Sequence, residues 1–339
     1  KTVNGYIKRL PADTYNVQNR GGRGITGMTT REDDIVENMF ICSSHDYVML
    51  FSNLGRMYRI KAYEIPEGSR TSKGMNMVNI VPLMKKEKIT VILPASELDE
   101  EKYIAMVTKK GTIKRTKVSE FRNTRKSGII AISIDDDDEL AFVRMTDGSQ
   151  NLFVATKNGL AIQFKETDVR AMGRNARGVK AINMRAGDEV VDMAVTTPDT
   201  KLLTITETGY GRISNIGDYR IQTRGGKGLT NYRTEKYGCV AATIPVTGEE
   251  DIIMIASNGI VIRIFAGDIS TFSRPAKGVR VMRVADGEKI LSVGIAEHNE
   301  EEVNDKPEEA DADAGTVDNA ELEAENQQAD EEIIETEEN

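Results

Sequence analysis

The sequence is poor in the residues from which catalytic and metal sites are usually built. Its 339 residues include no tryptophan, two histidines (His45 and His298) and two cysteines (Cys42 and Cys239). With only two histidines, we expect no histidine-based catalytic site. Each cysteine stands in an apolar run outside any Cys-x-x-Cys or Cys/His cluster. We interpret both as small buried hydrophobic side chains in a reducing compartment, with a disulfide or zinc site as the alternative. The Gly-x-x-x-x-Gly-Lys-[Ser/Thr] loop that cradles nucleotide phosphates is also absent.

Long hydrophobic runs and an even distribution of charge are missing as well. No apolar stretch approaches the roughly 18 residues that span a membrane, and no signal-like segment opens the chain at Lys1, so we expect a piece of a longer cytoplasmic polypeptide. The net charge of −9 combines 54 acidic and 45 basic residues, but residues 297–339 hold 19 of the acids and one lysine. Residues 1–296 keep 35 acidic and 44 basic residues, which makes this body about +9 and the remainder about −18. We predict a basic folded domain over residues 1–296 and a disordered acidic tail over residues 297–339.

What the sequence does contain is a repeat of about 50 residues, present in six copies across residues 1–296. Two glycines mark each copy, the first in a predicted hairpin turn and the second at the end of a basic segment. The two lie 19 residues apart in five copies and 17 in the third, and the second glycines recur at spacings of 50, 54, 50, 50 and 50 residues. A fixed period of this length is typical of solenoids and bladed folds. The first glycines are Gly5, Gly55, Gly111, Gly159, Gly209 and Gly259, and the second glycines are Gly24, Gly74, Gly128, Gly178, Gly228 and Gly278.

Every copy has the same pattern of short predicted strands. An apolar run such as Leu152–Ala155 precedes the first glycine, and Asn-Gly at 158–159 supplies the positive φ that a tight hairpin needs. A second strand follows the hairpin, a third follows the second glycine, and a fourth such as Leu140–Val143 completes the copy. The first strands are apolar almost throughout, which indicates that both faces of each sheet are covered. We therefore predict an all-β, six-bladed, propeller-like ring of four-stranded blades, in which the first copy lacks its opening strand and residues 84–102 form a longer loop.

Two features of this pattern leave alternatives open. A kelch-type propeller has a similar period, but its blades carry a Gly-Gly pair and a Trp, whereas Gly-Gly occurs here only at 21–22 and 225–226. The acidic run Asp135–Glu139 resembles a cation site. It falls at the repeat position of other interstrand turns, so we interpret it as a solvated turn and expect no metal site.

The segment before the second glycine is basic in every copy. A ring with this loop on each blade carries evenly spaced cations, which suits a phosphate polymer wound around it. The alternative is that the cations only solubilise the outer edge of the sheets. Neither loop aromatics nor a recognition helix is evident, so we predict backbone-dominated binding and bending of duplex DNA. The candidate DNA-binding residues are Gln18, Arg20, Gly21, Gly22, Arg23, Gly24, Arg70, Lys73, Arg125, Lys126, Arg174, Arg177, Arg224, Lys227, Arg274 and Lys277.

The first of these loops carries the most specific resemblance to a known family. Residues Gln18–Gly24 read Gln-Asn-Arg-Gly-Gly-Arg-Gly. They are similar to the seven-residue box of the C-terminal domain of the A subunit of bacterial DNA gyrase, and the resemblance extends in order over residues 1–296. Asn19 stands where the box usually has a cation, and a near-copy, Gln-Thr-Arg-Gly-Gly-Lys-Gly, occupies Gln222–Gly228. Consecutive glycines allow a tight turn and a close approach of backbone N–H groups to phosphate.

The resemblance implies a six-bladed β-pinwheel, a propeller relative with altered strand connections, around whose rim duplex DNA wraps. It also implies that wrapping lets the gyrase holoenzyme, two A and two B subunits, introduce negative supercoils at the expense of ATP. The catalytic residues, ATP and Mg²⁺ would then lie elsewhere in the holoenzyme, and this domain would need no cofactor and associate with the bacterial nucleoid. The alternatives are the corresponding domain of topoisomerase IV and a propeller that binds protein partners. We also hypothesise that the acidic tail competes with DNA for the basic rim.

Overall fold

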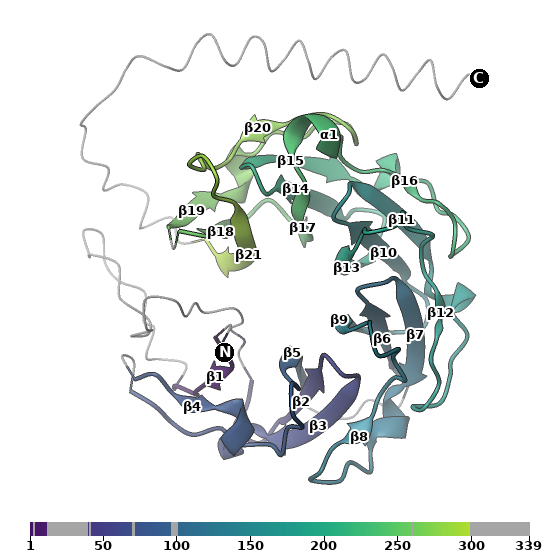
Figure 1. The fold of residues 1–339 in the computed structure, drawn as a ribbon, viewed down its shortest axis with the longest axis vertical. Coiled ribbons are helices and arrows are strands. Elements are labelled where there is room, and N and C mark those ends of the chain that lie inside the picture. The colour runs from purple at the N-terminus through teal and green to yellow at the C-terminus, as the bar shows by residue number, and fades with distance from the viewer. Residues whose placement is uncertain are drawn as a thin grey trace.

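The computed structural model describes residues 1–2, 4–11, 40, 42–69, 72–95, 101–258 and 260–298. These residues form short antiparallel strands arranged in small sheets around a common centre (Figure 1). The helical elements are one turn of α-helix, α1 (Thr234–Tyr237), and short 3-10 turns, most of which follow the second strand of a repeat. In this part of the chain no helix is long and apolar enough to cross a membrane. The 3-10 turns are Ala62–Glu64, Met77–Asn79, Val118–Phe121, Glu166–Asp168, Ile216–Asp218 and Ala266–Asp268.

Four of the sheets have four strands each, named below in their spatial order. The first is β5 (Ile89–Ala95), β2 (Tyr47–Ser52), β3 (Arg56–Lys61) and β8 (Ile129–Ile130). The second is β9 (Leu140–Thr146), β6 (Tyr103–Thr108), β7 (Thr112–Lys117) and β12 (Val179–Lys180). The third is β13 (Val190–Thr196), β10 (Asn151–Thr156), β11 (Leu160–Lys165) and β16 (Leu229–Thr230). The fourth is β17 (Val240–Val246), β14 (Lys201–Thr206), β15 (Tyr210–Asn215) and β20 (Val279–Arg280).

Two smaller sheets lie at the ends of the arc. At one end, β21 (Ile290–Glu297), β18 (Glu250–Ala256) and β19 (Val261–Phe265) form a three-stranded sheet. At the other, β1 (Tyr6–Ile7) pairs with β4 (Met75–Asn76). The described residues thus form five blades, and the prediction of six is wrong for them. A blade takes three strands from its own repeat, and the described part of the first repeat supplies only β1.

The outermost strand of each four-stranded blade comes from the following repeat, not from its own. In each case the residue after the second glycine pairs with the residue two positions after the first glycine of the preceding repeat. The prediction of four strands per repeat is confirmed in number, but the third strand completes the neighbouring blade. This exchange links consecutive repeats through backbone hydrogen bonds and places the basic loops on the preceding blade. The pairs are Ile129 with Met57, Val179 with Ile113, Leu229 with Ala161, and Val279 with Gly211.

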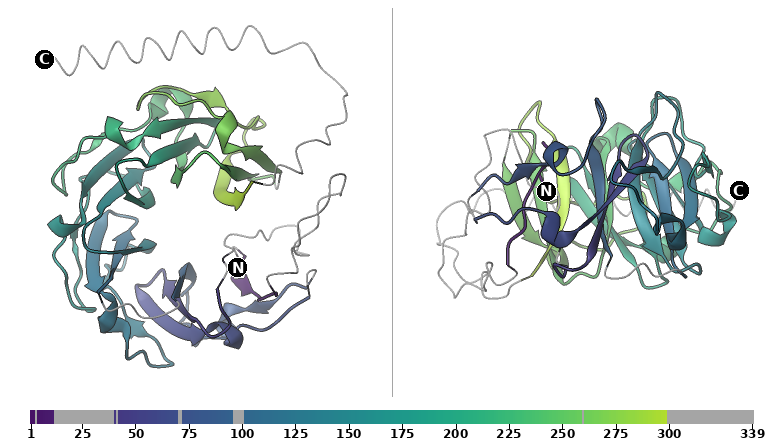
Figure 2. Two further views of the ribbon diagram at one scale, coloured as in Figure 1. Left: turned by 180° about the vertical axis from the view of Figure 1, so that it is seen from behind. Right: turned by 90° about the horizontal axis from the view of Figure 1, so that it is seen from below.

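The hydrophobic core lies between the faces of neighbouring sheets. The first strands β2, β6, β10 and β14 are buried at every position after the first, which confirms that both faces are covered. The inner strands β5, β9, β13, β17 and β21 contact one another in sequence along the side of each blade that faces the centre (Figures 1 and 2). Between two blades, Phe51 and Phe121 meet edge to face at 6.3 Å, a favourable aromatic geometry.

Two further sequence predictions need correction. The segment 84–102 is not simply a long loop, because its run Ile89–Ala95 is the inner strand β5. β-branched and apolar residues fill most of this run, which suits a strand packed against a neighbouring sheet. Cys42 and Cys239 carry free thiols, but both are half-buried and not fully buried. Burial and the nearby Asp46 carboxylate raise the pKa of the Cys42 thiol, so this sulfur is an unreactive thiol and not a thiolate.

Candidate nucleic-acid interface

The basic loops lie on the outer rim of the arc because each leads directly into an outermost strand, β8, β12, β16 or β20 (Figure 1). The second glycine is required at the point where the loop joins the strand. Gly278 has φ +75°, and a Cβ added there would lie 2.3 Å from the carbonyl oxygen of Gly211 in the preceding blade. No residue with a side chain fits this approach at a left-handed backbone conformation. The repeated glycine therefore presses each loop against the blade before it.

In the fifth and sixth repeats the arginine four residues before the second glycine braces the loop against the preceding repeat. Arg224 donates from Nε to the carbonyl oxygen of Asp168 at 2.9 Å and from Nη1 to that of Lys180 at 3.3 Å. Arg274 is only 9% exposed and donates from Nη1 to the carbonyl oxygen of Thr230 at 3.1 Å. Lys180 and Thr230 occupy the same repeat position, so the two braces are equivalent. These arginines contribute charge to the rim, but part of their hydrogen-bonding capacity holds each loop to the preceding repeat.

The cation immediately before the second glycine is exposed in the fourth and fifth repeats and half-buried in the second and sixth. Lys227 and Arg177 are exposed, and Arg177 forms an ion pair with Asp135 of the neighbouring acidic turn. The ammonium of Lys73 lies 3.8 Å from the ring centroid of Tyr6, and that of Lys277 lies 4.8 Å from the ring centroid of Tyr210. Such contacts orient a cation while leaving its charge available to a phosphate.

Tyr6 and Tyr210 are functional candidates that sequence reasoning missed. Both directly follow a first glycine, and the exchange of outer strands brings them beneath the loop of the next repeat. The exposed Arg280 also lies over the Tyr210 ring at 5.1 Å and donates from Nη2 to its hydroxyl at 2.6 Å. The basic loops themselves contain no aromatic residue. In the second and sixth repeats the aromatic residue that contacts the loop lies one repeat earlier in the sequence, so it could be found only once the pairing of the strands was known.

A second row of cations also went unassigned in the sequence. Arg122, Arg170 and Arg220 occupy equivalent positions after the 3-10 turns and are exposed. The next residues in two repeats, Ala171 and Ile221, form backbone bridges to the second strands β7 and β11. These arginines therefore follow the outer side of the blades, alongside the basic loops.

The remaining predicted residues fall into two groups. Arg125 and Lys126 are exposed, and Arg174 is half-buried. The box Gln18–Gly24 and Arg70 lie outside the described residues, so their assignment stays a prediction. The near-copy at Gln222–Gly228 is described. Within it the N–H of Gly225, which has φ +78°, donates to the carbonyl oxygen of Ala181 at 2.6 Å.

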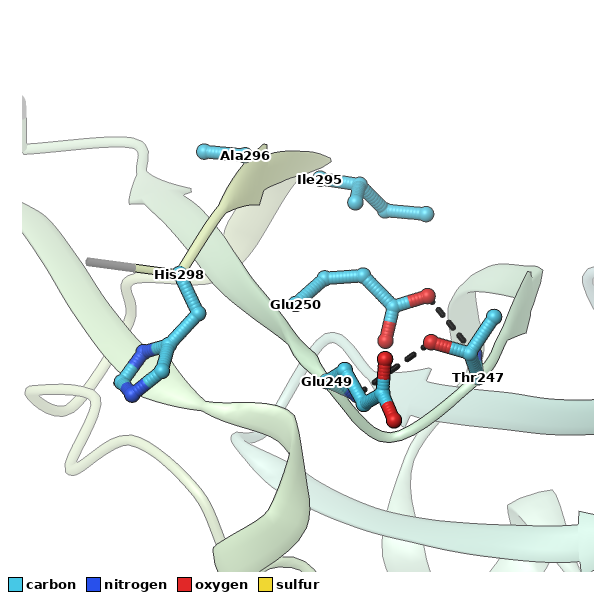
Figure 3. Close-up of a pocket in the computed structure, with 6 residues that line it drawn as sticks. All are labelled: Thr247, Glu249, Glu250, Ile295, Ala296 and His298. Carbon is cyan, nitrogen blue, oxygen red and sulfur yellow. Dashed lines mark hydrogen bonds between the residues drawn. The ribbon is translucent and has the colours of Figure 1, made fainter. Parts of the chain in front are cut away.

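A pocket at the last blade is the candidate for a small-molecule site, and Figure 3 shows its lining. The Glu250 side chain points toward Thr247, and its carboxylate accepts from the Thr247 N–H at 2.6 Å and the Gly248 N–H at 2.8 Å. Burial favours the protonated acid, but these backbone donors outweigh it, and the pKa of Glu250 is lowered. His298 contacts Asp251 instead, with 2.7 Å between Nδ1 and Oδ1. The carboxylate of Glu250 thus holds a turn and is not poised as a general base.

The acidic run Asp135–Glu139 forms ion pairs with neighbouring cations. Asp137 pairs with Lys110, Glu139 pairs with Lys109 at 2.7 Å, and Asp135 pairs with Arg177. Throughout the part of the chain that the structure describes, no three His, Cys, Asp or Glu side chains group to hold a metal ion. This turn is tied to the rim by charge pairs, in keeping with its interpretation as an interstrand turn.

Comparison with known proteins agrees with this architecture. The family model for the DNA gyrase C-terminal domain, beta-propeller, matches residues 2–43, 46–95, 102–147, 150–197, 200–246 and 250–297. The chain belongs to this family. Its six matched units coincide with the six sequence repeats, which confirms the repeat and the resemblance even though the described residues complete five blades.

Curated relatives of this chain are A subunits of DNA gyrase. The A subunit of DNA gyrase from Clostridium acetobutylicum is 46% identical over 306 residues, covering 90% of this chain and 37% of the relative. The A subunit of DNA gyrase from Staphylococcus aureus is 41% identical, covering 92% of this chain and 36% of the relative. The chain therefore spans about a third of the length of the curated relatives it matches.

Two solved structures are similar over most of the chain. A DNA gyrase A C-terminal domain has a TM-score of 0.70 at 28% identity and covers 87% of this chain and 97% of its own. The C-terminal domain of DNA topoisomerase IV has a TM-score of 0.74 at 25% identity and covers 87% of this chain and 91% of its own.

Proposed function

We propose that this chain binds duplex DNA along the outer rim of its blades and wraps it, as the DNA-wrapping part of a DNA gyrase. The observation that carries the proposal is the exchanged outer strand, which sets one cation-bearing loop on each of the four-stranded blades. A rim with regularly repeated cations neutralises phosphates at many points. Smooth bending of 20–30 base pairs by 40–90° costs about 1–6 kcal/mol, so many distributed contacts must offset it.

The proposed phosphate contacts fall into two sets. In the described blades they are the accessible cations of the loops and of the second row. Arg174, Arg224 and Arg274 add charge, and Arg224 and Arg274 also brace their loops. In the undescribed segments the proposed contacts are Gln18, Arg20, Gly21, Gly22, Arg23, Gly24 and Arg70, which sequence similarity to the gyrase box supports. The accessible cations are Arg122, Arg125, Lys126, Arg170, Arg177, Arg220, Lys227 and Arg280, and the half-buried Lys73 and Lys277 are added to them.

Wrapping would present a neighbouring DNA segment to the cleavage core with one handedness. The holoenzyme, made of two A and two B subunits in the bacterial cytoplasm at the nucleoid, would then introduce negative supercoils with ATP. Catalytic residues, ATP and Mg²⁺ would belong to other parts of that enzyme, and this domain would act without a cofactor. The family membership and the length of the gyrase A relatives support this division of labour.

A topology assay tests the proposal. The chain is incubated with relaxed closed-circular DNA, a relaxing topoisomerase is added, and the linking number is measured after the protein is removed. Wrapping shifts the linking-number distribution in one direction in proportion to bound protein. DNA binding without any shift would leave the chain a simple DNA-binding domain, and absence of salt-dependent binding would refute the proposal.

The corresponding domain of topoisomerase IV is the second candidate, because that structure has a slightly higher TM-score than the gyrase domain. The identity to the curated A subunits of gyrase and the near-intact box favour gyrase. Replacing the C-terminal domain of a gyrase A subunit with this chain distinguishes the two candidate functions. We expect ATP-dependent negative supercoiling, whereas relaxation and decatenation alone would favour topoisomerase IV. A propeller that binds only protein partners would bind no DNA in either assay.

A further inference from the structure

One position in the second strand of each blade lies directly beneath the basic loop of the next repeat. It is the third residue after the first glycine: Tyr58 in β3, Lys114 in β7, Ile162 in β11 and Arg212 in β15. Lys114 and Arg212 are both 0% exposed. Buried cations are costly unless their donors are hydrogen-bonded, so the acceptors that these two side chains reach show what they stabilise.

Both buried cations reach backbone carbonyls of the rim. Lys114 Nζ donates to the carbonyl oxygen of Ala131 at 2.5 Å and to that of Arg174 in the next basic loop. Burial and the nearby Arg174 charge lower the pKa of Lys114 to about 8, against an opposing effect of Glu120. The lysine therefore remains in this environment at an energetic cost that its bonds to the loop offset.

Arg212 makes the equivalent connection two repeats later. Its Nε donates to the carbonyl oxygen of Ala276 in the next basic loop at 3.0 Å, and its Nη2 donates to that of Asn231. Asn231 occupies the same repeat position as Ala131, three residues after the second glycine. In both blades one cation thus joins this carbonyl to the basic loop of the following repeat.

The blade between them connects the equivalent carbonyl to the next basic loop without a cation. Here Ile162 takes the place of the cation, and the carbonyl that corresponds to Ala131 and Asn231 belongs to Ala181. It accepts from the backbone N–H of Gly225 at 2.6 Å. Gly225 can make this bond because its φ is +78°, a conformation that glycine adopts without strain.

The residues that replace Gly225 in the other loops explain why a cation is needed there. Pro275 stands at the equivalent position in the sixth repeat and has no N–H to donate. Asn175 stands there in the fourth repeat and does not adopt the positive φ with which Gly225 makes its bond. In the fourth and sixth repeats a loop without the double glycine thus lies over a buried cation, and in the fifth repeat the loop with the double glycine lies over isoleucine, while the loop of the third repeat lies over Tyr58.

We propose that Lys114 and Arg212 are positioning residues that give the basic loops of the fourth and sixth repeats the shape that Gly225-Gly226 gives the fifth. Each loop then presents the cation before its second glycine (Arg177, Lys227 or Lys277) to DNA at the same place on its blade. In the fifth repeat the loop bonds to the carbonyl through its own Gly225 N–H. In the fourth and sixth repeats a buried cation in the second strand beneath the loop connects the loop to the corresponding carbonyl. This role rests on the proposed binding of duplex DNA by the rim.

The test exchanges one solution for the other in the full 339-residue chain. K114I removes the cation, and K114I/N175G/A176G rebuilds the fourth loop with the isoleucine and double glycine of the fifth. K114R is the conservative control, because Arg212 already occupies the equivalent site. Two quantities are measured: affinity for a 150-base-pair duplex, and hydrogen exchange of the Ser133 amide, which donates to the carbonyl oxygen of Ala176 in this loop at 3.2 Å.

We expect K114I to weaken DNA binding by about fivefold, which corresponds to about 1 kcal/mol, and to speed exchange at Ser133. The triple variant and K114R should restore both quantities to within about twofold of wild type, since a net hydrogen bond is worth about 1 kcal/mol. Wild-type exchange and affinity in K114I would overturn the proposal, as would a triple variant no better than K114I. If K114I fails to fold, R212I and R212I/P275G/A276G make the same comparison in the sixth repeat.

The exchange measurement is made without DNA, so it separates this proposal from the proposed function. Loss of loop protection in K114I with no DNA binding by wild type would uphold the positioning role in the free protein and refute the DNA-binding function. If K114I binds DNA as the wild type does and its loop is equally protected, the DNA-binding function is upheld and the positioning role of Lys114 is refuted.

Discussion

Removing the cation before the second glycine from several blades tests the proposed binding of DNA by the rim. The variant replaces Lys73, Arg177, Lys227 and Lys277 with alanine. Each phosphate contact contributes about 0.9 to the slope of log affinity against log salt concentration, so four contacts contribute about 3.6. When the salt concentration rises fourfold, from 50 to 200 mM, the affinity of both proteins should fall. The factor by which the wild-type affinity falls should be about 100 times the factor for the variant.

The assay is a titration of a fluorescent 150-base-pair duplex at several salt concentrations. The matched control replaces four exposed lysines outside the basic loops: Lys85, Lys88, Lys109 and Lys110. It removes the same charge from the chain, so it should lower affinity slightly while keeping the slope near that of wild type. Equal slopes for the two variants would refute the reasoning, because phosphate contact would then depend on net charge and not on the loops.

Three further predictions concern the fold, its pH dependence and the acidic tail. Gly278→Ala should destabilise the chain by about 2–4 kcal/mol in urea unfolding, because the new Cβ meets a backbone carbonyl at a positive φ; Gly187→Ala, with positive φ but open space, should cost about 1 kcal/mol. Burial raises the pKa of Asp192 to about 6 despite the Arg144 charge, so its ionisation destabilises the folded state above that pH. On acidification from pH 7 to pH 4, the free energy of unfolding of the wild type should therefore rise by up to about 3 kcal/mol relative to that of Asp192→Asn. A relative fall in this free energy on acidification would contradict the assignment. Removing residues 299–339, the part of the predicted acidic tail (297–339) that lies outside the described residues, should raise DNA affinity at low salt and not at high salt. Equal affinity at low salt would exclude competition by the tail.

Several parts of the rim were accessible from sequence because they follow from local chemistry. The two glycines of each repeat identify a hairpin and a close backbone approach, and both occur at positive φ wherever the structure describes them. The apolar first strands predicted sheets covered on both faces, and the buried patterns of β6 and β10 agree. The basic segment before the second glycine was also visible at once, since charge and spacing need no tertiary information.

The distinct roles within each loop were not accessible in the same way. Arg224 and Lys227 stand three residues apart in one basic segment and look alike in the sequence. Arg224 donates to backbone carbonyls in the 3-10 turn and the outermost strand of the preceding repeat, while Lys227 is exposed. Tyr210 and Arg212 lie a whole repeat before the loop that they support, so no window along the chain brings them together with it.

The sequence by itself determined the period, the strands of each repeat and the presence of a cationic loop, because turn chemistry and apolar patterning act over a few residues. The tertiary structure decided which blade each third strand completes, and with it the count of five blades among the described residues. It also decided which cations brace loops, which are accessible and which lie buried beneath the rim. A two-residue strand carries too few side chains to specify its partner. Its pairing is set by the blade that a neighbouring repeat has already formed, and so the shape of the rim depends on contacts some 50 residues apart.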